Sequence, residues 1–393
     1  MKKLYQLLVF VLIMVIMGCG SGGSDAVPPA LSSEKAITAF NFTSPAATGT
    51  VTEATHTIAI AVPFGTDVTD LVPTIAISSG ASISPDTGVE QDFTGDVTYT
   101  VTAEDASTQA YVVTVTKDSL LVMVNVPAGS FQRDATSENI STVTTAFRMS
   151  QHEITQAQYF AVTGSAQSWF TPDNGYTEDT TRPVEVVTWF DAVEFCNDLS
   201  TLEGLTPVYA ITERQPSDGS HPIIRATVIV NWANNGYRLP TEMEWMWAAM
   251  GATSDRSNGY TGTGTNTTGY TKGYAGSTEV EDTQVDIGDY AWYDVNSDST
   301  THPVGTAGTT GHPNELGLYD MSGNVCEWVW DWYDDPYPYG TQTDYRGAAS
   351  GTNRVLRGGS WFDEAPYAAV ANRSIYSNPS VRLNFIGFRV VRP

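Results

Sequence analysis

Residues 317–328 read GLYDMSGNVCEW, and this short stretch carries the pattern that decides the fold of most of the chain. Long loops rich in Gly, Tyr and Trp separate it from three more short motifs: RLPTEMEW at 238–245, RVLRGGSW at 354–361 and GFR at 387–389. This composition favours strands and ordered loops over a bundle of helices. From residue 121 onward we therefore expect short strands, few helices and much loop.

Helices are predicted at three places in this part of the chain. One begins near Thr155, and a second lies within residues 182–204, where apolar residues between Ala192 and Leu199 share one face. A third follows Pro240 in RLPTEMEW, because Thr at position 241 and Glu three residues later form a capping box.

The charge of the chain excludes one class of partner. Its 393 residues carry 44 Asp and Glu against 19 Lys and Arg, a net charge of -25. Such a surface repels the phosphate backbone, so no nucleic acid is expected as a partner. The length allows two or three domains.

The first residues indicate export. Lys2 and Lys3 precede an apolar run too short for a stable membrane span, and the run ends in IMGC at residues 16–19, which resembles a bacterial lipobox. Cys19 is then the lipidation site, residues 1–19 are a signal peptide and residues 20–33 a flexible tether. We expect an exported protein, lipid-anchored to a bacterial membrane and placed at the outer membrane or cell surface. An ordinary secretory signal with an accidental Cys is the alternative.

Residues 34–117 are predicted to form a separate all-β domain. Runs such as TIAIAV and AYVVTVTKD alternate apolar with Thr or Ser positions at a period of two, and Gly, Pro and Asp turns separate the runs. The pattern resembles the immunoglobulin-like or cadherin-like sandwiches of bacterial surface proteins. With one His and no Cys, this part has no catalytic pattern, so we expect a spacer.

The four motifs, in their order, resemble those of the formylglycine-generating enzyme (sulfatase-modifying factor) family across residues 121–393. The resemblance implies an α+β domain of C-type lectin-like fold, with two helices, small twisted sheets and much loop. Most of the Trp, Tyr and Gly residues would pack this loop-rich body.

The cysteine ligands that the oxidising members of the family use to bind copper have no counterpart in this sequence. Members that oxidise a sulfatase cysteine bind copper through two cysteines shortly after the Gly-Gly-Ser motif, a soft-ligand site suited to Cu(I). The matching positions hold Asp363 and Ala368, and the five histidines show no close ligand spacing. We expect no copper and no enzyme; a metal-dependent oxidase of the family's type is the alternative. Cys196 and Cys326 could form a disulfide or remain separate buried thiols.

One metal site carries over through the resemblance. In the family, the GLYDMSGNVCEW turn wraps a structural calcium ion. The matching positions are Asp320 and Glu327 by side chain, with Gly323 and Val325 by main-chain carbonyl. These are hard oxygen donors of the kind that calcium prefers. The alternative is that the two carboxylates cap turns and pair with an arginine, without an ion.

Residues 354–393 have patterned ends and an irregular interior, with neither helical nor strand period. The arrangement resembles the variable region of diversity-generating retroelement target proteins of the Treponema variable-protein type. In those systems template adenines are randomised. An AAC codon can then encode Phe, Asp, Pro, Tyr, Ser, Ile, Val, Leu or Asn, but never Lys, Gln, Met, Trp or Glu. The clustered positions of the segment obey this restriction, and Glu364 departs from it.

These clustered positions are the predicted ligand-binding residues, and we expect their aromatic side chains to project into solvent. They are Phe362, Asp363, Pro366, Tyr367, Ser374, Ile375, Tyr376, Ser377, Ser380, Val381, Leu383, Asn384 and Phe385. Gly358, Gly359, Trp361 and the final GFR would hold the frame, since loops on a rigid frame can vary without unfolding the body. The predicted function is a surface-displayed lipoprotein that binds an unknown macromolecular ligand, with protein favoured. Ordinary loop and core residues in an inactive relative of the enzymes are the other interpretation.

Overall fold

The computed structural model describes residues 30–252, 264–277, 287–308, 311–373 and 376–393. The described residues divide into two compact units, one within residues 30–62 and 67–116 and the other within residues 63–66 and 117–393. The predicted signal peptide, Cys19 and most of the tether lie outside the described residues. In the described ranges, none of the helices is long and apolar enough to cross a membrane.

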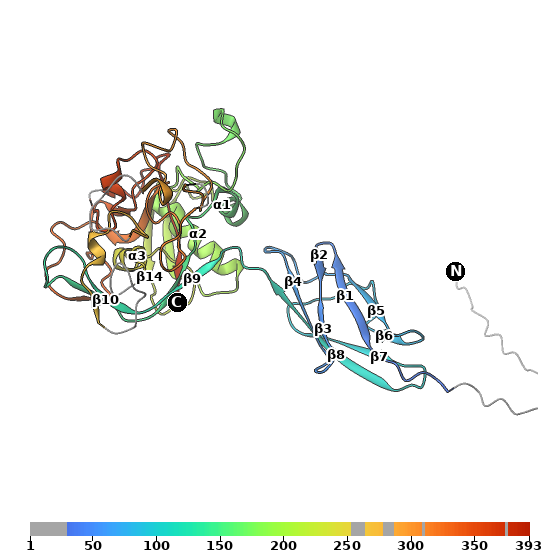
Figure 1. Ribbon diagram of the computed structural model, residues 1–393. Helices are drawn as coiled ribbons and strands as arrows, with labels where there is room; N and C mark the ends of the chain where they lie inside the picture. The colour runs from blue at the N-terminus through green and yellow to red at the C-terminus, as the bar shows by residue number, and fades with distance from the viewer. Residues whose placement is uncertain (1–29, 253–263, 278–286, 309–310, 374–375) are drawn as a thin grey trace, which may run out of the picture. The chain divides into compact units, whose positions relative to one another are not determined.

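The first unit has two small sheets around one core, with strand orders β2-β1-β5 and β3-β4-β8-β7-β6 (Figure 1). The predicted period of two is present, because Ile58, Ile60 and Val62 in β4 are buried and alternate with exposed residues. The strands are β1 Ile37–Thr43, β2 Ala46–Thr48, β3 Thr50–Thr52, β4 Thr57–Val62, β5 Pro73–Ile77, β6 Ser82–Ser84, β7 Val97–Thr102 and β8 Thr108–Lys117. An immunoglobulin-like topology for this unit stays a prediction.

In the described part of the second unit there are three α-helices, one more than the family resemblance implied. They are α1 (Gln156–Thr163), α2 (Trp189–Leu202) and α3 (Glu242–Ala249), and each begins at a threonine in a capping box. The predicted start at Thr241 is confirmed, since its hydroxyl accepts a hydrogen bond from the Glu244 main-chain N–H at 3.2 Å. The predicted apolar face of α2 is buried in the core.

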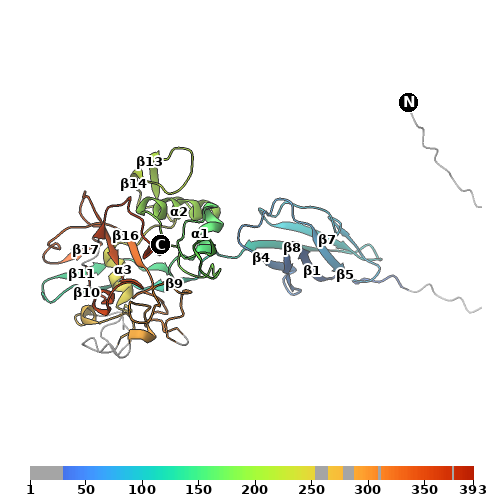
Figure 2. The same cartoon turned by 90° about the horizontal axis from the view of Figure 1, so that it is seen from above.

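Four small sheets complete the second unit, with strand orders β15-β10-β11-β17, β21-β12-β9, β13-β14 and β19-β18-β16-β20. Figure 2 shows the β13–β14 hairpin beside α2, where the Asn197 side chain donates to the main-chain oxygen of Tyr209 at 2.7 Å. The strands are β9 Met123–Val126, β10 Gly129–Gln132, β11 Ile140–Val143, β12 Phe147–Ser150, β13 Tyr209–Gln215, β14 Arg225–Val230, β15 Thr265–Asn266, β16 Cys326–Trp332, β17 Gln342–Thr343, β18 Arg354–Arg357, β19 Tyr376–Ser377, β20 Ile386–Gly387 and β21 Val391–Arg392. Short 3₁₀ turns are η1 Pro172–Asn174, η2 Gly269–Thr271, η3 Ile287–Asp289 and η4 Ala365–Ala368.

The end of the chain is paired with strands from distant parts of the sequence. β20 runs parallel to the start of β16, and β21 pairs antiparallel with β12. Val391 also forms a bridge with Arg238, which precedes α3. The segment before β20 is therefore held at both ends by strands.

The core of the second unit is rich in tryptophan, as the composition predicts. Trp189, Trp245, Trp247 and Trp328 are completely buried. The indole N–H of Trp328 donates to the main-chain oxygen of Val187 at 3.1 Å. Each buried indole thus has an apolar environment for its rings, and the described N–H groups find main-chain or carboxylate acceptors.

Candidate ligand-binding face

The C-terminal segment starts from a strand that is buried throughout, β18. Directly after it, Gly358 and Gly359 have positive φ angles of 96° and 70°. A Cβ added at Gly359 would lie 3.0 Å from the main-chain carbonyl of Tyr367. Glycine is needed here for both the backbone conformation and the close approach, which brings η4 against the frame.

Trp361 fixes the segment to other parts of the unit. Its side chain is buried, its Nε1 donates to the main-chain oxygen of Asn384 at 2.9 Å, and its ring packs edge-on against Phe170 with ring centroids 5.5 Å apart. The main chain beside Trp361 is therefore held from two directions.

Along the segment, a few buried residues are interspersed among the predicted variable positions, while Asn378 and Arg382, which are not predicted variable positions, are exposed as well. The buried residues between Trp361 and Ile386, both included, are Trp361, Ala365, Ala368, Val370, Pro379 and Ile386. Among the predicted ligand-binding residues that the structure describes, none is buried, and Ser374 and Ile375 lie outside those residues. Four large side chains project into solvent: Phe362 is 62% exposed, Tyr367 40%, Tyr376 44% and Leu383 41%.

Five of the described contact residues are half-buried rather than exposed: Asp363, Ser377, Val381, Asn384 and Phe385. Val381 and Phe385 are half-buried and pack against the main core cluster. The Phe385 ring also stacks on that of Phe362, with centroids 5.9 Å apart and an angle of 18° between the planes. The expectation that Phe385 projects freely into solvent is wrong in this respect, because its ring partly supports the more exposed one.

Asp363 also bonds to the frame. Its Oδ2 accepts hydrogen bonds from the Ser360 hydroxyl at 2.6 Å and from the Cys326 thiol at 3.6 Å. From the sequence, Cys326 lay outside this segment, yet the fold brings its thiol to the position that matches the first copper cysteine of the family. The contact between Cys326 and Asp363 could not be predicted from the sequence, because it depends on the pairing of β16 with β18 and β20. Strands β18 and β20 belong to residues 354–393, called the tail below, and no local pattern marks their pairing with β16.

This arrangement does not fit the family's copper site. One thiol faces a carboxylate, and the second cysteine position holds Ala368, which is buried. Burial, followed by the nearby charge of Asp363, raises the pKa of the Cys326 thiol well above its usual value, so the thiolate that Cu(I) prefers is disfavoured. Cys196 is likewise a free, buried thiol in α2, so the two cysteines follow the alternative without a disulfide.

Glu327, one of the predicted calcium residues, already has partners. Its carboxylate accepts hydrogen bonds from Arg389 Nε at 2.8 Å and from the indole N–H of Trp245 at 2.7 Å. Asp320 lies nearby and accepts the main-chain N–H of Gly305 at 2.6 Å. All of these carboxyl groups are buried.

A carboxylate bound to a guanidinium does not fit a calcium ligand set, which needs several free oxygen donors. In the part of the chain that the structure describes, no three His, Cys, Asp or Glu side chains group so that they could hold a metal ion. The geometry favours the alternative in which the carboxylate pairs with an arginine. Calcium at Asp320, Gly323, Val325 and Glu327 remains a prediction from the resemblance.

Residues outside the predicted set border the face. Tyr333, which follows β16, stacks on Tyr376 with ring centroids 3.8 Å apart. The main-chain N–H of Asp294 donates to the main-chain oxygen of Asp363 at 3.1 Å, and the next residue, Val295, is 75% exposed. Neither the loop that contains Val295 nor the one that contains Tyr333 carries a local motif. Their position beside the face could therefore not be predicted from the sequence.

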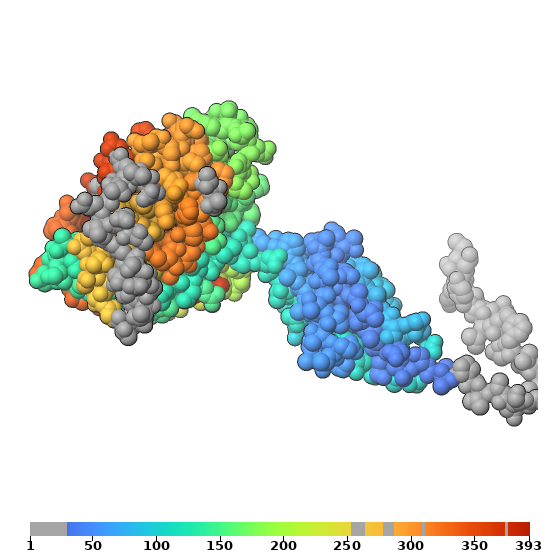
Figure 3. All heavy atoms as spheres, viewed as in Figure 1, coloured from blue at the N-terminus to red at the C-terminus, as the bar shows by residue number. Residues whose placement is uncertain are grey.

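A second loop, residues 164–184 after α1, reaches the frame through Phe170. It lies beside the loop that precedes β16, because Arg182 Nη1 donates to Thr300 at 3.1 Å and the Val304 N–H donates to the Thr181 oxygen at 3.1 Å. Figure 3 shows these loops next to each other on the surface, in green and orange. The exposed Trp169 stands in this loop.

Glu185 holds the loop in place from beneath. Its buried carboxylate accepts hydrogen bonds from the main-chain N–H groups of Trp169 at 2.8 Å and Phe170 at 3.1 Å. Burial raises the pKa of Glu185 to about 7, and the two hydrogen bonds oppose that rise without cancelling it.

A pH-dependent contribution to stability follows from Glu185. Its folded pKa of about 7 lies above the ordinary value of 4.5, so its stabilising contribution is present below pH 4.5 and is lost as the pH rises towards 7. Relative to Glu185→Gln, the native chain should lose about 2–3 kcal/mol of unfolding free energy between pH 4.5 and pH 7.5. Urea unfolding followed by tryptophan fluorescence measures this, since all 10 tryptophans lie in the second unit. If the difference in unfolding free energy between the native chain and Glu185→Gln were the same at pH 4.5 and pH 7.5, the raised pKa of Glu185 would be contradicted.

Comparison with known proteins places these features in a family. The family described as "Sulfatase-modifying factor enzyme 1-like domain" matches residues 108–393, and "SGBP, N-terminal" matches residues 37–115. The solved structure of Treponema denticola variable protein 1 is 35% identical and has a TM-score of 0.54, covering 70% of this chain and 95% of that protein.

Two curated relatives of similar sequence are a chaperone protein and an enzyme. The chaperone protein LppX of Paenibacillus barcinonensis is 34% identical over 257 residues, which are 63% of this chain and 81% of that protein. The formylglycine-generating enzyme of Streptomyces coelicolor is 31% identical over 182 residues, 43% of this chain and about half (52%) of that enzyme. The motifs, the small-sheet fold and these matches agree, and the chain belongs to the family of sulfatase-modifying factor enzyme 1-like domains.

Proposed function

We propose that this protein is an exported lipoprotein that binds a macromolecular ligand, with protein favoured, through the diversified C-terminal face of its second unit. The observation that carries the proposal is that, among the described residues, none of the positions allowed by the codon restriction and predicted to bind is buried and the large side chains of Phe362, Tyr367, Tyr376 and Leu383 are exposed, while Trp361 and Ile386 at the two ends are buried. Similarity to Treponema denticola variable protein 1 supports the same interpretation.

The chemistry of the face suits contact with another macromolecule. Phe362, Tyr367 and Tyr376 offer large areas with few rotatable bonds, so little entropy is lost when they are covered. The stacking of Tyr376 on Tyr333 and of Phe362 on Phe385 restricts them further. Pre-ordered aromatic side chains of this kind are typical of binding hot spots.

The anchoring part of the proposal depends on the N-terminal residues. The lipobox at residues 16–19 would attach the chain to a membrane through acylated Cys19, and residues 20–33 would serve as a tether. The first unit has a core of its own and would serve as a spacer.

Alanine at an exposed tail position should weaken ligand binding without unfolding the protein. We expect Phe362→Ala or Tyr376→Ala to reduce affinity by about 2 kcal/mol, roughly 30-fold, while the unfolding free energy changes by less than about 1 kcal/mol. Affinity capture from cell-surface extracts, followed by titration of the captured protein, measures the first quantity. Matched controls are Ile229→Ala and Val122→Ala, which remove similarly exposed apolar side chains outside the tail. Capture that is insensitive to the tail variants, or unfolding of Tyr376→Ala, would contradict the proposal.

Two observations separate the proposal from its alternative. A near-copy of the tail codons beside a reverse-transcriptase gene, differing at template adenines, would support diversification, and its absence from the genome would remove that part. An enzyme of the formylglycine-generating type would instead consume oxygen when copper or iron is titrated in. Metal-dependent turnover of a cysteine peptide would overturn the binding function. The contact between Cys326 and Asp363, with no second cysteine beside them, argues against such turnover.

A further inference from the structure

A pocket of about 510 Å³ lies between α1 and the loop of residues 164–184, separate from the tail. The loop is closed over α1 by main-chain hydrogen bonds: the Gln156 N–H donates to the Arg182 oxygen at 2.9 Å, and the Ala157 N–H to the Thr180 oxygen at 3.0 Å. Its other end leaves α1 at Gly164, which has a positive φ of 68°. These contacts fix both ends of the loop, so the pocket is part of the folded unit.

The lining of the pocket is largely apolar. Phe160, Ala157, Ala166, Pro172 and Val184 contribute to the wall, and the Phe160 side chain is 55% exposed although it stands on a helix. The aromatic ring that anchors the loop, Phe170, points instead into the frame beside Trp361. The loop thus covers the pocket without filling it, and the volume is in the range of small-molecule sites.

The rim of the pocket is negative. Asp173, Glu178 and Asp179 line it, and no Lys or Arg is among the lining residues that the structure describes. Asp179 accepts hydrogen bonds from Thr181 within its own turn. For Asp173 and Glu178, the described residues provide neither a hydrogen bond nor an ion pair.

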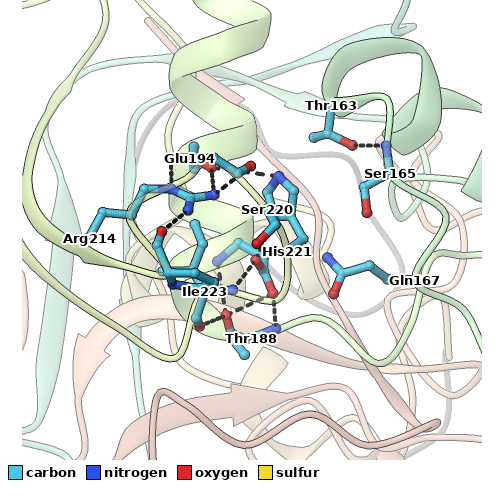
Figure 4. Close-up of polar contacts among 12 residues, drawn as sticks. Thr163, Ser165, Gln167, Thr188, Glu194, Arg214, Ser220, His221 and Ile223 are labelled. Carbon is cyan, nitrogen blue, oxygen red and sulfur yellow. Dashed lines mark hydrogen bonds and ion pairs between the residues drawn. The ribbon is translucent and has the colours of Figure 1, made fainter.

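Behind the inner wall, which is formed by Tyr159, lies a group of carboxylates that are paired with Arg214 and His221. Figure 4 shows Gln167 from the loop beside the group that contains His221, Glu194 and Arg214. The Gln167 side chain donates to the Tyr159 hydroxyl at 2.7 Å, and Arg214 pairs with Glu194 at 2.7 Å. Burial, and then the carboxylates of Asp191 and Glu194, raise the pKa of Tyr159 well above its usual value. The pocket therefore offers apolar surface beside the carboxylates of its rim.

We propose that this pocket binds a small organic cation, an amine with an aromatic or aliphatic body, with the body against Phe160 and the ammonium group towards Asp173 and Glu178. The apolar lining selects the body, and the charge of the rim selects a cation over an anion of the same shape. The proposal concerns a site distinct from the tail, so it can stand or fall independently of the macromolecular ligand.

A pair of probes with the same ring and linker but opposite charge tests the proposal. Tryptamine and indole-3-propionate are titrated into the full chain by calorimetry, and we expect tryptamine to bind at least about tenfold more tightly. Adding salt should weaken tryptamine binding, because exposed carboxylates are screened. Equal binding of the two probes, or no binding of tryptamine at millimolar concentration, would overturn the proposal.

Variants locate the site. Asp173→Asn/Glu178→Gln should reduce tryptamine affinity about tenfold, whereas Glu138→Gln/Glu364→Gln, which removes the same charge from exposed carboxylates outside the pocket, should leave it unchanged. Phe160→Ala should weaken binding as well. Because the Phe160 side chain is 55% exposed, this substitution should leave the protein folded, so a loss of affinity reports on the pocket. Loss of tryptamine binding in Phe362→Ala would place the probe at the tail instead and would refute the pocket.

Discussion

Replacing Trp328 with alanine should destabilise the second unit by about 3–5 kcal/mol. The side chain is completely buried in a core cluster that also holds residues of α2 and β18, so its removal leaves a large cavity. The substitution also removes the N–H that satisfies the Val187 oxygen at 3.1 Å. Urea unfolding monitored by the remaining tryptophans gives the free energy directly.

The matched comparison for Trp328 is Phe362→Ala. Both substitutions delete a large aromatic ring, but Phe362 is 62% exposed and should cost less than about 1 kcal/mol. Similar losses for the two variants would mean that the tail ring belongs to the core, and the distinction between frame and contact positions would be wrong.

Replacing Arg389 with methionine should also cost about 3–5 kcal/mol, although methionine fills most of the same volume. Arg389 is completely buried and its guanidinium pairs with Glu327 at 2.7 Å while donating to the Tyr319 oxygen at 2.8 Å. Without it, the Glu327 carboxylate is left buried and without a counter-charge, close to two more buried carboxyl groups, Glu153 and Asp320.

The pH dependence of the Arg389 variant has a definite sign. Burial raises the pKa of Asp320 to about 6 and that of Glu153 well above its usual value, and Arg389 opposes both rises. In Arg389→Met these carboxyl groups stay protonated to higher pH, so the loss of stability should be smaller at pH 5 than at pH 7.5. The double variant Arg389→Met/Glu327→Gln should recover part of the loss, because the unpaired charge is removed. A loss below about 1 kcal/mol in the single variant, or no recovery in the double one, would contradict this account.

Features with a local physical cause could be predicted from the sequence. The capping box at Thr241 and the alternation in β4 depend on neighbouring residues only, and both are present. The exposure of Phe362 and Tyr376 also follows from a pattern within one segment, the codon restriction combined with a rigid frame.

Features that depend on distant parts of the chain could not be predicted. Cys326 meets Asp363, and Tyr333 meets Tyr376, only because β16 and β18 pair and bring the tail against them. Likewise, the half-burial of Phe385 comes from the core beneath it and leaves no mark in the composition of the tail. The pocket beside α1 is closed by hydrogen bonds from the far end of its loop, which carries no motif.

The pairing of β21 with β12 makes β12 depend on residues 391–392 for one of its two neighbours in the sheet. A chain cut short before residue 386 would lack both β20 and β21, leaving β12 and the start of β16 without these neighbours. Exposed strand edges of that kind promote aggregation and proteolysis. Chains truncated before β20 should therefore be lost to aggregation or proteolysis more readily than chains that contain both strands.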